Sequence, residues 1–167
     1  MEETDVLRAA VVFLHATHED LLRSLLEWKL PGAPAKYLAD IPLQGKPART
    51  KFTLDDLAAH RGSTVDDLIA RSVLQSLKRS NFNHPGEIER ALDKIGLDKD
   101  LLKLFKPQLG PLMARRHLIV HRADHSADSP GRGSSFALAL HQKTVELWHE
   151  ALREFGTNVL NELQEIP

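Results

Sequence analysis

An arginine and two histidines lie close together in one stretch of this chain, as Arg116, His117 and His121. Residues four apart in a helix are neighbours on one face, so the two imidazoles should lie together, with Asp124 one turn further along the same flank. Histidine takes up and releases protons near neutral pH, and arginine carries a permanent positive charge that attracts anions. These three residues are therefore candidates for acid–base chemistry on an anionic ligand.

The surroundings expected for Arg116 are unusual for a cation. At about 100° per residue, it lies near the middle of an apolar helical stripe, which consists of Leu109, Leu112, Met113, Ile119, Val120 and Ala123. Burying an unpaired guanidinium is costly. Arg116 must therefore meet a carboxylate, reach a water-filled crevice, or face a partner subunit or an anionic ligand. The structural alternative is a buried ion-pair anchor that fixes a dimer.

The charge around these residues has one sign. Residues 101–123 contain no Asp or Glu, but they contain Lys103, Lys106, Arg115, Arg116 and Arg122. The net charge of the whole chain is only −1, which argues against a strongly basic nucleic-acid coat but leaves a local anion-attracting surface. Arg115, Arg122 and Asp124 are the candidate binding residues of this surface, and a solvated basic face is the alternative.

Metal and cofactor chemistry have less support. Two histidines at this spacing suit zinc, but a zinc site needs a third or fourth ligand. Asp124 and His125 are the only candidates for this further ligand near the motif. The absence of cysteine excludes thiolate ligands and disulfides. The chain also lacks a glycine-rich phosphate loop and a G-x-S-x-G turn. We therefore expect no metal and no cofactor.

Apolar residues recur at helical spacing throughout, which predicts an all-α protein: an antiparallel helical bundle with short accessory helices, in one domain over residues 1–167. Long helices are expected over residues 4–30, from Pro107 through the motif, and, after a loop around Gly131 and Gly133, over about 135–163. Trp28 and His18 are expected on the apolar stripe of the first of these helices. Shorter helices are expected over 54–61, 64–79, 87–94 and 98–105, with Thr53 as N-cap of the first and Ser63 or Thr64 as N-cap of the second. The prolines and glycines of residues 31–52 predict an irregular surface crossing.

The start of the chain is acidic, and no apolar run approaches the roughly 18 residues of a membrane span. A signal peptide would begin with basic residues. These features predict a cytoplasmic protein that is neither exported nor inserted into a membrane.

The segment Arg116-His117-Leu118-Ile119-Val120-His121 resembles the Arg-polar-x-x-x-His signature of the HEPN superfamily, and in particular the branch associated with RiboL-PSP proteins. Residues 52–58, 68–73 and 88–97 and the last helix, with Trp148, are similar to other helices of that branch. The resemblance thus covers about residue 50 to the C-terminus. One departure is His117, where the branch often has asparagine.

The resemblance implies a dimer that brings two copies of the motif to one groove, and often a metal-independent endoribonuclease acting as a toxin or antiviral effector. RNA supplies its own nucleophile, the 2′-hydroxyl, so cleavage needs a base, an acid and a cation for the phosphorane charge. In this scheme His121 is the base and Arg116 stabilises the phosphorane. The acid is His117 or His121 of the partner subunit.

The expected partners are RNA, a second copy of the chain, and a cognate antitoxin or regulatory protein. Asp124 would either orient an imidazole or form a helix-end salt bridge with Arg115 or Arg122. A function of another class stays open, namely a non-catalytic HEPN-like module in which Arg116 and His121 hold a dimer, a nucleotide or a partner protein together.

Overall fold

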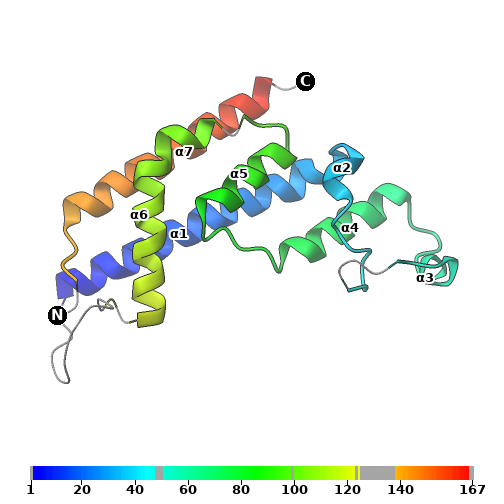
Figure 1. Ribbon diagram of the computed structural model, residues 1–167, viewed down its shortest axis with the longest axis horizontal. Coiled ribbons are helices and arrows are strands. Elements are labelled where there is room, and N and C mark those ends of the chain that lie inside the picture. Colours follow the sequence, from blue (N-terminus) through cyan, green and yellow to red (C-terminus); the bar gives the residue numbers. More distant parts are fainter. Residues whose placement is uncertain (1, 48–50, 99, 123, 125–137, 166–167) are drawn as a thin grey trace.

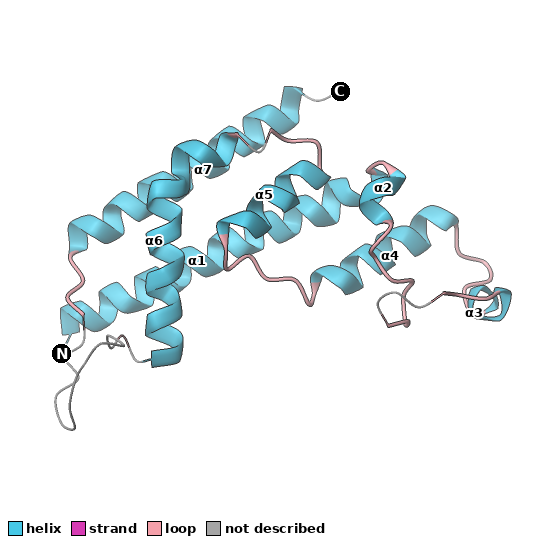
Figure 2. Cartoon of the chain, viewed as in Figure 1, coloured by secondary structure: helices cyan, strands magenta, loops and turns pink. Residues whose placement is uncertain are grey.

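The computed structural model describes residues 2–47, 51–98, 100–122, 124 and 138–165 of the chain. Every regular element in these ranges is a helix, which confirms the all-α prediction (Figure 2). The long helices are α1 (Glu2–Lys29), α6 (Leu101–Arg122) and α7 (Gln142–Glu165). The shorter elements are η1 (Leu30–Gly32), α2 (Ala35–Leu38), α3 (Leu54–Ala58), α4 (Val65–Leu77) and α5 (Pro85–Lys94).

The three long helices contact one another and form the body of the bundle. In Figure 1, α1 and α7 run in the same direction, and α6 runs back across them. The C-terminal part of α6, which carries the arginine–histidine motif, therefore lies over the first half of α1. No helix in the described ranges is both long and apolar enough to cross a bilayer.

Local capping signals set the start of three short helices. The hydroxyls of Thr53 and Thr64 accept from the amides of Asp56 and Asp67, whose carboxylates accept in return. The prediction of Thr53 is therefore confirmed, and of the two candidates for the next helix the N-cap is Thr64. His84 caps α5 in the same way, and this helix therefore begins at Pro85, two residues earlier than expected. The 31–52 crossing also contains a short helix, α2, where only irregular structure was expected.

The prediction that residues 98–105 and the motif lie on separate helices is wrong, because α6 continues through Pro107 and Pro111. Proline removes a backbone hydrogen bond and bends a helix rather than always ending it. The two rings are four residues apart on the exposed side of α6. In Figure 1 the start of α6 runs beside α7 before the helix turns across α1. Buried side chains on both sides of the prolines hold this bent helix to the core.

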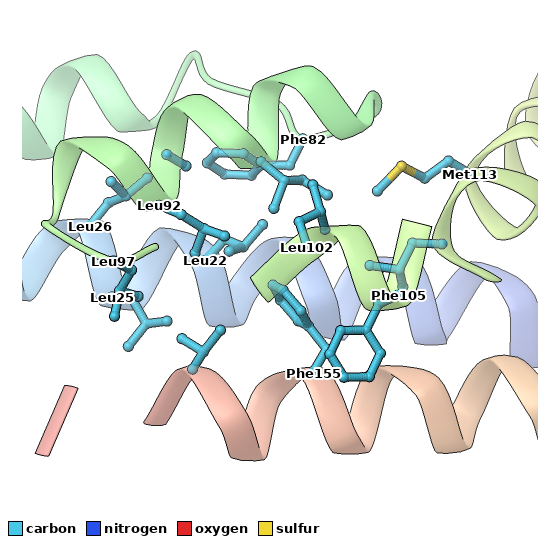
Figure 3. Close-up of a cluster of buried hydrophobic side chains, with 14 of the residues drawn as sticks. Leu22, Leu25, Leu26, Phe82, Leu92, Leu97, Leu102, Phe105, Met113 and Phe155 are labelled. Carbon is cyan, nitrogen blue, oxygen red and sulfur yellow. The ribbon is translucent and has the colours of Figure 1, made fainter. Parts of the chain in front are cut away.

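The core lies where α1, α5, α6 and α7 meet. Figure 3 shows side chains from these helices pointing toward one another, with Leu22, Leu92, Leu102 and Phe155 fully buried. The rings of Phe105 and Phe155 pack edge to face, with centroids 5.7 Å apart. Trp28 was expected on the buried stripe of the first helix but is exposed, since it lies three residues beyond Leu25 and is rotated about 60° away from it.

The last helix begins later than predicted. Residues 138–141 are not helical, and α7 begins at Gln142. The amide of Leu138 donates to the carbonyl of Asp124, and the carbonyls of Leu138 and Ala139 accept from Arg115, so this stretch is bonded to other parts of the chain. The start expected near residue 135 and the loop expected around Gly131 and Gly133 lie outside the described residues.

Candidate functional site

The two motif histidines form an exposed pair on α6. The ring centroids of His117 and His121 are 4.7 Å apart, with an angle of 48° between the planes. Both side chains are exposed to solvent, so a ligand can reach them. The prediction that they are neighbours on one face is confirmed.

Arg116 lies on another side of the same helix. Its side chain is half-buried, and its Nε is buried without a hydrogen-bond partner among the described residues. Burial lowers the pKa of His15 of α1, and the positive charge of Arg116 lowers it further, so Arg116 lies within electrostatic range of this histidine. Five residues correspond to a rotation of about 140° around a helix. Within one chain, therefore, the structure brings His117 to His121 but does not aim Arg116 and His121 at a common point.

Two histidines of α1 are buried in the bundle, and the ring of His18 packs against that of Phe155 of α7, with centroids 5.4 Å apart. His15 and His18 are 1% and 3% exposed. Burial lowers the pKa of His18 to about 4, with a smaller contribution from His15. Burial also lowers the pKa of His15, against the opposing effect of the Glu19 carboxylate. Both imidazoles are therefore neutral at neutral pH.

Only one of these two histidines was predicted to lie on the apolar stripe of the first helix, namely His18, and its burial confirms this. His15 was missed, although it follows Val11 by four residues and precedes Leu22 by seven, which is the spacing of the buried face. The helical period was thus the signal that could have identified His15.

Asp124 holds the end of α6 to the rest of the bundle. Its carboxylate is fully buried, and it lies 2.7 Å from Nε and 2.8 Å from Nη2 of Arg115 and 2.9 Å from Nε of Arg8. The residue has a positive φ of 64°, a conformation that aspartate tolerates better than most residues. The pair with Arg115 confirms the helix-end salt bridge, whereas Arg8, 116 positions away, was not predicted.

This cluster changes the interpretation of the candidate binding residues. Arg115 was predicted to attract a ligand, but its guanidinium is occupied by Asp124 and by the carbonyls of Leu138 and Ala139. Asp124 has no exposed surface with which to touch a ligand. Both residues therefore stabilise the fold. The side chain of Arg122 and the whole of His125 lie outside the described residues.

The arrangement of the two histidines at the surface of α6 suits proton transfer. Within the described ranges, no three His, Asp or Glu side chains come together as metal ligands would. Two adjacent exposed imidazoles offer a proton acceptor and a proton donor within one turn of helix. Comparison with known proteins adds no relative, since no family model, no curated protein and no solved structure matches this chain.

Proposed function

We propose that this protein is a metal-independent endoribonuclease of the HEPN type that acts as a homodimer. The exposed pair of His117 and His121 carries the proposal, because two imidazoles with centroids 4.7 Å apart can divide the roles of base and acid. The side chain before them, Arg116, supplies the positive charge that the resemblance assigns to the phosphorane. No other described part of the chain has two exposed histidines in ring contact.

The proposed reaction uses RNA as its own nucleophile. One neutral imidazole, that of His121, takes the proton of the 2′-hydroxyl while the 2′-oxygen attacks the adjacent phosphorus. The bond from phosphorus to the 5′-oxygen breaks, and a protonated histidine, either His117 or His121 of the partner subunit, gives that oxygen a proton. The products are a 2′,3′-cyclic phosphate and a 5′-hydroxyl. DNA lacks the 2′-oxygen and is not a substrate.

The charge and exposure of α6 support the proposed dimer. None of the ion pairs among the described residues involves Arg116. Val120 is 47% exposed next to His121, and this last part of α6 has no acidic residue to repel a second copy. A second copy at this end of α6 would place two histidine pairs and two arginines around one groove. A monomer at micromolar concentration in light scattering would contradict this arrangement.

The test of activity is a digest of single-stranded and structured RNA by the purified protein in EDTA. We expect cleavage, with cyclic-phosphate and 5′-hydroxyl ends identified by mass spectrometry. Arg116→Ala should lower the rate about 10²–10³-fold, as loss of one preorganised donor does, and His121→Ala should have a comparable effect. His117→Asn should match His121→Ala only if His117 transfers a proton.

His149→Ala is the matched control, because His149 is an exposed histidine on α7, and it should cut RNA like the wild type. Equal cleavage by the wild type and the Arg116→Ala/His121→Ala double variant would show that the activity belongs to another site or to a contaminant. Loss of cleavage in EDTA with recovery in zinc or manganese would overturn the metal-free mechanism.

A second candidate is the non-catalytic module, and the rotation of about 140° between Arg116 and His121 favours it. A protein that dimerises and cuts no RNA would support this candidate. If the protein is a nuclease, its activity would harm the cell when unrestrained. We therefore include a cognate antitoxin or regulatory protein in the proposal.

A further inference from the structure

An open groove of about 600 Å³ lies beside the histidine pair, between α6 and the segment that leads into α5. One wall consists of Asn83, His84 and Pro85, and the other of Met113, Ala114 and His117. His117 therefore belongs both to the groove and to the histidine pair. The groove extends from the proposed reaction site toward the N-terminal end of α6.

The chemistry of the groove is apolar with polar edges. Met113 is buried and lies among small or rigid neighbours, Pro85 and Ala114. The side chains of Asn83 and His84 are exposed. Nδ1 of His84 accepts a hydrogen bond from the amide of Gly86 at 3.1 Å, so a neutral His84 carries its proton on Nε2. The Asn83 amide offers both a donor and an acceptor.

We propose that this groove binds one unpaired base of an RNA strand whose adjacent phosphate lies at His117 and His121. This inference rests on the proposed function. No Lys, Arg, Asp or Glu lines the groove, so away from His117 it offers no permanent charge to a phosphate or an acidic peptide. A base is planar and apolar on its faces, and it carries hydrogen-bonding groups on its edge. Such bases stack on histidine and on apolar side chains, and they bond to amides along the edge.

The geometry also indicates the kind of strand. A base can enter the groove only if it is turned out of a helix, since base pairing would hold it away from α6. The groove therefore selects single-stranded segments, loops or bulges. It also sets a direction along α6, with the base toward Gly110 and the scissile phosphate toward His121.

The test is to fill the groove without disturbing the fold. Ala114 is exposed in the middle of α6, and leucine is a good helix former, so Ala114→Leu should fold like the parent. The control is Gln108→Leu, which places the same side chain on an exposed part of α6 that does not line the groove. Both changes are made in a His121→Ala background, so that bound RNA stays intact.

Binding of a labelled single-stranded oligoribonucleotide is measured by fluorescence anisotropy, and a duplex of the same length serves as competitor. Losing one stacked base costs about 1–3 kcal/mol, so Ala114→Leu should weaken binding at least about fivefold. Gln108→Leu should bind like the parent, and the duplex should compete poorly. Equal affinities for the two leucine variants would overturn the inference, as would equal competition by the duplex or no RNA binding at all.

The outcome separates this inference from the proposed function. If the wild type cuts RNA but the two leucine variants bind it equally, the groove does not hold a base and the nuclease stands. If the wild type cuts nothing but Ala114→Leu alone loses affinity, the groove binds a base and the nuclease proposal fails.

Discussion

Replacing Asp124 with alanine should lower the free energy of unfolding more than any single change on the surface. The carboxylate is 0% exposed, and it faces two guanidinium groups whose side chains are 21% exposed in Arg8 and 14% exposed in Arg115. Its removal leaves both cations without this partner at the junction of α1, α6 and the segment before α7. The contact with Arg8 joins residues 116 positions apart in the sequence, whereas the contact with Arg115 closes the end of α6.

The size of the effect follows from burial. Breaking a buried ion pair by removing one partner costs about 3–5 kcal/mol, and the partial exposure of both arginines places this case near the lower end. Alanine at a positive φ adds about 1 kcal/mol. We therefore expect a loss of about 4 kcal/mol, out of the roughly 5–15 kcal/mol that stabilise a typical domain. Asp124→Asn should cost less, because asparagine tolerates this backbone and keeps one oxygen acceptor.

Urea unfolding followed by circular dichroism measures this loss as a shift of the midpoint at constant slope. Asp5→Ala is the matched control, because Asp5 also pairs with Arg8, at 3.0 Å, but is 56% exposed. An exposed pair contributes about 0–1 kcal/mol. If Asp124→Ala destabilises the protein no more than Asp5→Ala does, the account of the buried cluster is wrong.

Two further changes test the packing of α1. Because burial lowers the pKa of His18 from 6.5 to about 4, the folded state should lose about 2 kcal/mol between pH 7 and pH 5 from this group. The stability that neutral His18 contributes is complete above pH 6.5 and falls as the pH drops toward 4. His18→Leu should make the free energy of unfolding, measured by urea titration, depend less on pH. An unchanged pH dependence in this variant would contradict the assignment. A Cβ on Gly156 would lie 3.2 Å from Cδ2 of Leu21, so Gly156→Leu should cost about 1–3 kcal/mol by overpacking. A higher melting temperature would refute that.

Local signals made part of this structure predictable. Thr53 and Thr64 indicate the starts of helices because a capping box involves only four consecutive residues. The contact between His117 and His121 follows from helical spacing alone. In each case the interacting groups lie within one turn of one another, so the sequence contains everything that the contact needs.

Contacts between distant segments were not predictable in this way. Nothing local to Asp124 indicates that Arg8, at the other end of the chain, donates to its carboxylate. The continuity of α6 through Pro107 depends on the helices against which it packs, which outweigh the local preference of proline to end a helix. The surroundings of Arg116 were not predictable for the same reason, because they depend on how α1 packs against α6.

The adjacent arginines Arg115 and Arg116 of α6 thus have different surroundings, and replacing Arg116 should not lower stability. Arg115 has a buried carboxylate as partner, whereas none of the ion pairs among the described residues includes Arg116. A half-buried cation without an ion pair costs stability, and an apolar residue of similar length removes that cost. Arg116→Met should therefore unfold at the same or a higher urea concentration than the wild type, while RNA cleavage falls as far as in Arg116→Ala. Such a gain in stability with a loss of activity is typical of a residue kept for function. A loss of more than about 2 kcal/mol would instead identify Arg116 as a structural anchor of the kind that buried ion pairs provide.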